Sequence, residues 1–166
     1  RAQDLGLLAS VGTSSVMVKR ALKIAVFSTG NELVEPGLRP IKLGELYSSN
    51  QVTLLSLLKN WGMDVLDFGI IPDDPIEISK VLCEASDLAD CVITTGGVSV
   101  GEEDHVKTQI KKLGELVFWK LNIKPGKPMA LGMIGGTPIL GLPGNPVSAF
   151  VVFLLVAKPF IYAMQG

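Results

Sequence analysis

The sequence predicts an α/β fold in which helices cover both faces of a mostly parallel β-sheet, giving three α/β/α layers. Unbroken apolar runs, such as 24–27 and 91–93, alternate with longer segments of helical spacing. Strands that are apolar throughout are typical of parallel sheets buried on both faces. Single glycines and prolines separate the segments, and 48% hydrophobic with 19% charged residues indicate a globular protein with a well-filled core.

Residues 1–22 are predicted to be the tail of a preceding domain, and 23–166 a single main domain. Residues 3–11 have helical spacing and stop at Gly12, and 16–18 look like a short strand. The chain has no initiator methionine, which adds to the expectation that it is a fragment of a longer multidomain protein.

The first half of the main domain reads as strand, helix, strand and helix. A strand at 24–27 leads through an irregular loop at 34–45, rich in Gly and Pro, to a helix that begins near Ser48. A second strand is expected at 65–71. Asp74 then caps a helix at 75–88, whose first residue is a proline.

The second half adds a third strand at 91–95 and a helix from near Asp104 to Leu113. A short edge strand follows at 117–120. Two further strands are predicted from their apolar runs, and a Gly-Gly turn joins them as a hairpin. The residues of these two strands are 129–133 and 137–142.

A last helix is expected after Asn145, which would cap it, with Pro146 at its first position. The run 147–157 is strongly apolar, but Lys158-Pro159 is predicted to end it. A membrane span needs about 20 residues. A buried helix and no membrane contact are therefore expected.

Charge and cysteines limit the classes of partner. The formal net charge of −1 gives no electrostatic reason to expect nucleic-acid binding. Cys83 and Cys91 fall in apolar patterns, so both are predicted to be small core residues, and a reduced, cytoplasmic setting fits them best.

Polar and glycine residues follow the predicted strands, and the carboxyl ends of parallel strands share one edge of a sheet, where ligands bind. Acids beside glycine-rich backbone favour a phosphorylated ligand with a divalent cation such as Mg²⁺. Each residue alone also fits a turn or a helix cap. The candidates are Thr29, Gly30, Glu32, Asp73, Asp74, Gly96, Gly97, Ser99, Gly101, Asp104, Pro143, Gly144 and Asn145.

A basic segment at 118–128 interleaves lysines with prolines in a stiffened loop. The ammonium group of lysine is a compact cation suited to phosphate or another oxyanion. A solvated basic loop is the alternative interpretation.

Five motifs stand out along the chain: STGNEL (28–33), GIIPDDP (69–75), TTGGVSVGEED (94–104), FWKLNIKPGKP (118–128) and GLPGNPVSA (141–149). Together they resemble the molybdopterin molybdenumtransferase (MoeA) family, which includes the E domain of gephyrin. They occur in the family's order and cover nearly the whole chain. Asn31 stands where the family often has Asp, and His105 where an aromatic residue is usual.

The resemblance implies a MogA-like domain of a longer homodimeric protein. Its reaction would take adenylylated molybdopterin and molybdate, insert the molybdenum and release AMP with the help of Mg²⁺. Glu32, Asp104 and either Asp73 or Asp74 would surround the metal. Lys120 and Lys124 would hold molybdate or phosphate.

By the same resemblance, Pro143 and Pro146 would shape the pterin end of the pocket. The adenylyltransferase of the same pathway is an expected partner. A molybdopterin adenylyltransferase (MogA-like) and a non-catalytic scaffold module, as in gephyrin, are the alternative functions. Because residues of other domains close the family's site, the isolated chain is expected to fold but to turn over weakly or not at all.

Overall fold

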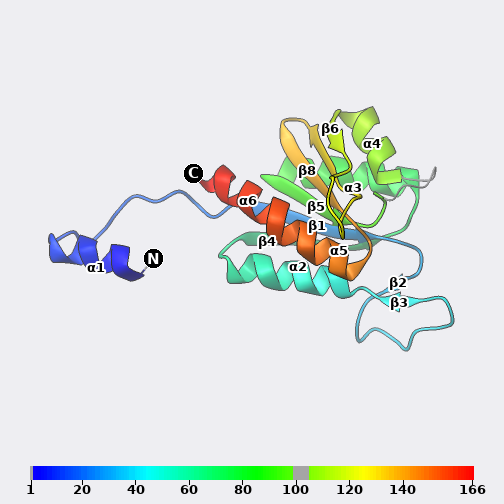
Figure 1. Cartoon of the computed structure of the whole chain (residues 1–166), viewed down its shortest axis with the longest axis horizontal. Helices are drawn as coiled ribbons and strands as arrows, with labels where there is room; N and C mark the ends of the chain where they lie inside the picture. Colours follow the sequence, from blue (N-terminus) through cyan, green and yellow to red (C-terminus); the bar gives the residue numbers. More distant parts are fainter. Residues whose placement is uncertain (1, 99–104) are drawn as a thin grey trace.

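The computed structural model describes residues 2–98 and 105–166, and it confirms the predicted three-layer α/β architecture (Figure 1). Six strands form one sheet in the order β4-β1-β5-β8-β7-β6. The four strands β4, β1, β5 and β8 are parallel, and β7 runs antiparallel to both of its neighbours. Their bounds are β1 Lys23–Thr29, β4 Asp64–Ile71, β5 Cys91–Thr95, β6 Glu115–Trp119, β7 Ala130–Ile134 and β8 Thr137–Leu142.

Helices cover both faces of the sheet. One face packs against α2 (Ser49–Asn60) and a continuous helical segment made of α5 (Pro146–Val152), η1 (Phe153–Ala157) and α6 (Lys158–Gln165). The other face packs against α3 (Pro75–Leu88) and α4 (His105–Leu113).

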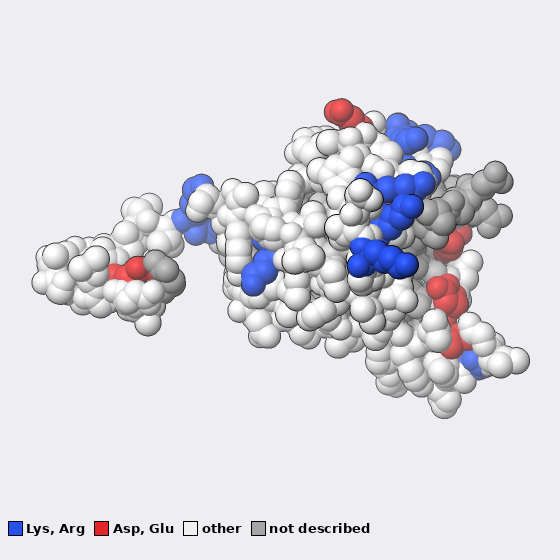
Figure 2. Space-filling model, in the orientation of Figure 1, with Lys and Arg blue, Asp and Glu red and all other residues white. Residues whose placement is uncertain are grey.

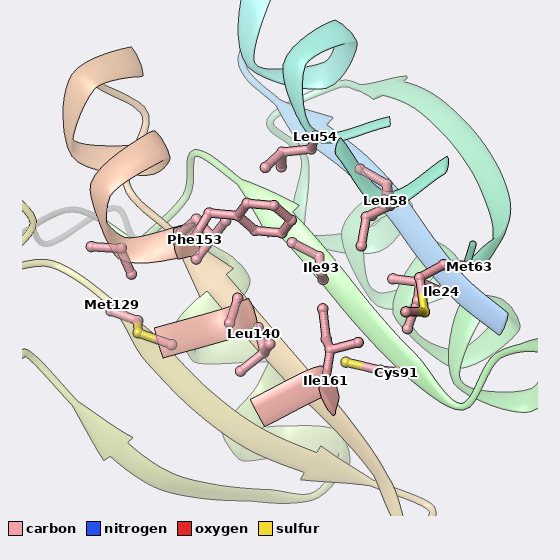
Figure 3. Close-up of a cluster of buried hydrophobic side chains, with 14 residues drawn as sticks. Ile24, Leu54, Leu58, Met63, Cys91, Ile93, Met129, Leu140, Phe153 and Ile161 are labelled. Carbon is pink, nitrogen blue, oxygen red and sulfur yellow. The ribbon is translucent and has the colours of Figure 1, made fainter. Parts of the chain in front are cut away.

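Alternate residues of β1 enter the two cores, as the period-two geometry of a strand requires. Ile24 and Val26 lie in the cluster with Phe153 (Figure 3), whereas Ala25 and Phe27 lie in the cluster on the α3 side. The strand is therefore buried on both faces, which is why its sequence shows no polar alternation.

The amino-terminal segment is structurally different from the rest. Helix α1 (Ala2–Ser10) has no buried residue and lies away from the sheet in Figure 1. The strand predicted at 16–18 is wrong: these residues are exposed coil, and Met17 is 96% exposed, because no neighbouring strand pairs with their backbone. At the end of this segment Arg20 contacts the domain, since its guanidinium donates two 2.6 Å hydrogen bonds to the Asp90 carboxylate.

The loop predicted between the first strand and α2 contains a small ordered feature. The two-residue strands β2 (Leu33–Val34) and β3 (Leu46–Tyr47) pair in parallel at its two ends. Between them, Arg39 forms a two-fold ion pair with Glu45 at 2.6 and 2.7 Å, and this pairing lowers the pKa of the Glu45 carboxyl to about 2.

The helix end predicted at Lys158-Pro159 is also wrong. Helical structure continues to Gln165, and the wide π-turn η1 ends at Ala157, two residues before Pro159. Proline disrupts a regular α-helix because it lacks an N–H and clashes with the preceding turn. By length and composition this one described segment, 146–165, is long and apolar enough to cross a membrane. Phe153 and Ile161 are buried in the core of the domain, whereas Val147 and Leu155 are exposed, so core packing accounts for only part of the apolar character.

The two cysteines differ. Cys91 is buried in β5 as predicted, and burial raises the pKa of its thiol to about 12. Cys83 is exposed on α3, so its predicted place in the core is wrong.

At the carboxyl end, the Lys19 ammonium group lies against Gly166, which brings the end of α6 back to the segment that leads into β1.

Candidate functional site

A cavity of about 360 Å³ lies at the carboxyl ends of β1, β4, β5 and β8. Nine of the residues predicted as site residues line it together, although they come from four separate parts of the chain. They are Thr29, Gly30, Glu32, Asp73, Gly96, Gly97, Pro143, Gly144 and Asn145.

Gly30 gives room to the Glu32 carboxylate. A Cβ on Gly30 would lie 2.6 and 2.8 Å from the two carboxylate oxygens of Glu32, and the φ of Gly30 is +151°. Any other residue at position 30 would therefore displace the carboxylate from its place at the cavity wall.

The glycine pair after β5 allows that strand to end directly against β1. A Cβ on Gly96 would overlap the Thr29 carbonyl oxygen, and a Cβ on Gly97 would overlap the Val106 side chain. The Gly96 N–H donates to the Leu142 carbonyl at 3.3 Å, so this amide is already paired within the sheet. The two glycines therefore allow close packing at the strand ends. From the sequence alone, glycine-rich backbone at this place had favoured binding of a phosphorylated ligand.

Asp73 and Asp74 are adjacent but occupy different environments. The Asp74 carboxylate accepts hydrogen bonds from the N–H groups of Ile76 (2.8 Å) and Glu77 (3.1 Å), so it caps α3. Asp73 instead lines the cavity, and its N–H donates to the Asn31 side chain at 3.0 Å.

Two oxygens in the cavity wall are buried without a hydrogen-bond partner among the described residues. They are Oδ1 of Asp73 and Oγ1 of Thr29, a residue only 4% exposed. A buried polar atom without a partner is costly to the fold. Such atoms at a cavity wall are the expected sign of a site that a ligand or ion completes.

The opposite wall belongs to the turn between β8 and α5. The Asn145 side chain accepts a 3.2 Å hydrogen bond from the Ser148 N–H and caps α5 as predicted. The Asn50 amide of α2 donates to the Gly144 carbonyl at 2.8 Å. The turn is therefore held in place both by its own helix and by α2.

A buried polar network supports the strands below the cavity. The Ser28 hydroxyl donates to the Gln51 side-chain oxygen at 2.7 Å and lies 2.9 Å from the Thr95 hydroxyl. The Gln51 amide donates in turn to the Asp67 carboxylate at 2.6 Å. The network ties β1, β5, β4 and α2 together, which fixes the strand ends that carry the site.

Some predicted site residues are placed elsewhere. Lys120 and Lys124 are exposed and are not among the described residues that line this cavity. Pro146 lines a separate cavity of about 400 Å³ between α2 and α5. The predicted residues Ser99, Gly101 and Asp104 lie outside the described residues.

The predicted metal set is represented here by two of its members. Glu32 and Asp73 share the cavity, whereas Asp104 is outside the described residues. Across residues 2–98 and 105–166, no three or more His, Cys, Asp and Glu side chains come together as a metal-binding group.

Three cavity residues were not predicted as site residues. Val98 follows the glycine pair, Pro128 ends the basic motif, and Ser148 follows the capping Asn145 by three positions. All three belong to motifs singled out in the sequence. The N-terminal turn of a helix that starts at the site edge would have pointed to Ser148.

Comparison with known proteins gives consistent relatives. Residues 25–163 match the family described as "Probable molybdopterin binding domain". The chain is 47% identical over 163 residues to the molybdopterin molybdenumtransferase of Haemophilus influenzae, covering 98% of this chain and 40% of that protein. It is 39% identical over 161 residues to the molybdenum cofactor synthesis protein cinnamon of Drosophila melanogaster, covering 96% of this chain and 26% of that protein.

A crystal structure of the molybdopterin biosynthesis MoeA protein from Pyrococcus horikoshii superimposes with a TM-score of 0.85 at 34% identity. The match covers 99% of this chain and 40% of that one. The chain therefore spans well under half the length of these relatives.

Proposed function

The chain belongs to the family of probable molybdopterin-binding domains, and from that premise we propose that its cavity binds the pterin substrate of a molybdenum-insertion reaction. The proposed reaction takes adenylylated molybdopterin and molybdate, inserts the metal and releases AMP. One observation carries the proposal: residues from four separate strand ends line a single cavity that includes two carboxylate side chains and a buried hydroxyl.

The residues present fit Mg²⁺, the cofactor that this reaction is proposed to use. Carboxylate oxygens are the ligands that Mg²⁺ prefers, and Oδ1 of Asp73 is buried without a partner among the described residues. Asp73 and Glu32 would hold the ion, with Asp104 as the predicted third carboxylate. The bound ion would offset negative charge that develops on the phosphoryl group during cleavage.

The two walls of the cavity would bind different ends of the substrate. The Thr29 hydroxyl and the two carboxylates would face the phosphate end, while Pro143, Gly144 and Asn145 would shape the pterin end. Because the Asn145 and Asn50 hydrogen bonds already fix the Gly144 turn, the pterin end would be formed before the substrate arrives.

The proposed partners are a second copy of the protein and the adenylyltransferase that makes the substrate, in the cytoplasm. Light scattering would test whether the protein pairs with a second copy. The proposal expects a dimer, and a protein that stays monomeric at all concentrations would contradict it.

Mg²⁺-dependent binding of adenylylated molybdopterin tests the proposed function, using calorimetry under anaerobic conditions. The wild-type chain should bind more tightly with Mg²⁺ than with EDTA. Asp73→Asn should weaken the Mg²⁺-dependent binding by at least about tenfold, which is 1.4 kcal/mol. The matched control is Asp74→Ala, which removes only the α3 cap and should keep the affinity of the wild type.

Two results would contradict the proposal. Equal losses of affinity for the two variants would mean that the weaker binding comes from a less stable fold. Binding that EDTA does not change would mean that no metal ion takes part. Consumption of ATP with unadenylylated molybdopterin would instead identify an adenylyltransferase. AMP release should be slow for this chain and faster for the full-length Haemophilus influenzae relative.

A further inference from the structure

A second cavity, of about 200 Å³, lies beside the site at the start of α2. It shares Gly144 with the cavity described above, and the Asn50 amide of α2 donates to the Gly144 carbonyl at 2.8 Å. We call it the side cavity. Its walls are residues 48–50 at the start of α2, Leu33 and residues 46–47 of the β2–β3 pair, Thr95, Gly144 and Pro146.

Helix α2 begins at the side cavity without a side-chain cap. Ser48 stands at the N-cap position, but within the part of the chain that the structure describes its side chain makes no cap hydrogen bond, and the first turn contains no acidic residue. By contrast, α3 and α5 are capped by Asp74 and Asn145. The first amides of a helix carry partial positive charge and lack partners within the helix. The start of α2 therefore offers donors to a hydrogen-bond acceptor in the side cavity.

The Ser48 hydroxyl is a second sign of a ligand. Ser48 lines the side cavity and is only 3% exposed, and its Oγ is buried without a hydrogen-bond partner among the described residues. A buried hydroxyl without a partner costs stability, so a ligand that completes it is the expected explanation. Ser48 also borders another cavity of about 420 Å³, but residues 49 and 50, which follow it in the helix, line the side cavity and not that one.

The side cavity is uncharged, in contrast to its neighbour. No Lys, Arg, Asp or Glu is among the described residues that line it, whereas Glu32 and Asp73 line the larger cavity. In Figure 2, lysine and arginine side chains gather over the α4 and β6 side of the molecule, and the surface over α2 is mostly white. An uncharged pocket with apolar walls and a few fixed donors suits a neutral, flat ring with one polar edge better than it suits an oxyanion.

The size of the side cavity limits what it can hold. Pockets that enclose a whole drug-sized ligand measure about 300–1,000 Å³. A volume of about 200 Å³ is smaller, so it suits one end of a larger ligand. Pro146, which the family resemblance places at the pterin end of the pocket, lines this cavity.

We propose that the side cavity binds the pyrimidinone end of the pterin ring system. The first amides of α2 donate to the ring carbonyl, and the Ser48 hydroxyl pairs with the same polar edge. The inference rests on the proposed function, because it assumes that the phosphate end of the same substrate lies with Glu32 and Asp73. It assigns substrate binding to Ser48 and the start of α2, which lie outside the five sequence motifs.

Fluorescence anisotropy of pterin, which is itself fluorescent, tests the side cavity. The wild-type chain should give a saturable rise in anisotropy. Ser48→Ala should raise the Kd about fivefold, which corresponds to about 1 kcal/mol and to the loss of one hydrogen bond. The matched control is Ser56→Ala on the same helix, whose hydroxyl donates to the Val52 carbonyl at 2.7 Å, and it should leave the Kd unchanged.

The melting temperature of Ser48→Ala separates binding from a structural role. Because the Ser48 hydroxyl has no partner among the described residues, its removal should leave the melting temperature of the free protein unchanged or raise it. A lower melting temperature together with weaker binding would mean that Ser48 supports the fold, and would overturn its assignment as a binding residue.

Two further ligands distinguish the ring from an anion. The diamino analogue of pterin has an amino group in place of the ring carbonyl, so it presents a donor to the α2 amides and should bind at least about fivefold more weakly. Inorganic phosphate, added at constant ionic strength, should not displace pterin. Displacement by phosphate, equal binding of the analogue or an unchanged Kd for Ser48→Ala would overturn the assignment.

Calorimetry with adenylylated molybdopterin separates this inference from the proposed function. Ser48→Ala should weaken binding by the same factor with Mg²⁺ and with EDTA, because Ser48 is not among the described residues that line the cavity with the two carboxylates. Wild-type affinity in Ser48→Ala, with Asp73→Asn still lowering the Mg²⁺-dependent binding, would refute the side cavity and leave the proposed function standing. Ser48-dependent binding of pterin without any binding of adenylylated molybdopterin would support the side cavity and refute the proposed function.

Discussion

The polar atoms at the two ends of the parallel strands differ in whether they have hydrogen-bond partners. At the amino ends of β1 and β5, the Asp90 carboxylate accepts hydrogen bonds from both terminal nitrogens of Arg20 and from the Lys23 N–H. At the carboxyl ends, Oδ1 of Asp73 and Oγ1 of Thr29 are buried without a partner among the described residues. The amino ends therefore pair their charged groups within the fold, whereas the carboxyl ends leave two oxygens unpaired at the cavity wall.

The largest expected effect comes from breaking the packing at the carboxyl ends. Gly96→Ala should lower the free energy of unfolding by about 2–4 kcal/mol, because the added methyl group overlaps the Thr29 carbonyl and the residue has a φ of +85°. Urea denaturation measures the loss. Gly144→Ala is the matched control: the nearest atom to its new methyl group is the Gly96 α-carbon at 3.8 Å, so the change should stay within about 0.5 kcal/mol.

The adjacent residues Asp73 and Asp74 allow the same comparison between a carboxylate with hydrogen-bond partners and one with an unpaired oxygen. Asp74→Ala should cost about 1 kcal/mol of stability, since it removes the cap that accepts two N–H groups of α3. Asp73→Asn should leave the stability unchanged or raise it by up to about 1 kcal/mol, because it removes a buried charge that has an unpaired oxygen. Denaturation without metal measures both, and a larger loss for Asp73→Asn would contradict the assignment.

Lys120→Gly tests the backbone strain at the end of β6. Glycine accepts a φ of +80° without strain, so the free energy of unfolding should rise by no more than about 1 kcal/mol or stay unchanged. Thermal melts of both proteins check this prediction, and a clear loss of stability would show that the lysine side chain itself supports the fold.

The smallest effect is expected at the amino ends. Arg20→Ala should change the free energy of unfolding only slightly at pH 7, since ion pairs near the surface contribute little. Hydrogen bonds from Arg20 lower the pKa of Asp90 from 3.8 to about 2. The pair therefore stabilises the fold above pH 3.8, and this contribution is lost as the pH falls toward 2.

The difference between wild type and Arg20→Ala should accordingly disappear at pH 2 and shrink in high salt. Denaturation of both proteins across this pH range measures it. A difference that persists at pH 2 would mean that Arg20 acts through packing and not through the ion pair.

Much of the sheet, and the edge of the sheet that carries the site, can be predicted from the sequence. Strand β1 is predictable because all of its side chains from Ile24 onward are buried, which leaves an unbroken apolar run. The segment 16–18 is equally apolar but has no pairing strand, and nothing local reveals that. The continuation of the last helix past Pro159 depends on a π-turn, which no local pattern indicates.

The site shows the same division. Adjacent to one strand end, Asp73 and Asp74 are equivalent in sequence, and only the start of α3 decides which carboxylate is used as a cap. The motif around Lys120 indicated an anion site. The contact of Lys107 with Trp119 depends on α4 and β6 meeting there, which the spacing of the sequence alone does not reveal.

The meeting of Lys19 with Gly166 means that the domain's polypeptide path nearly closes on itself. A circularly permuted chain, with Gly166 joined to the residues before β1 and new termini in the exposed loop at 35–45, would keep every strand neighbour and every wall of the cavity. Because Lys19 and Gly166 lie beside each other, the segment that enters β1 and the end of α6 both lie away from the carboxyl ends of the strands, where the cavity is.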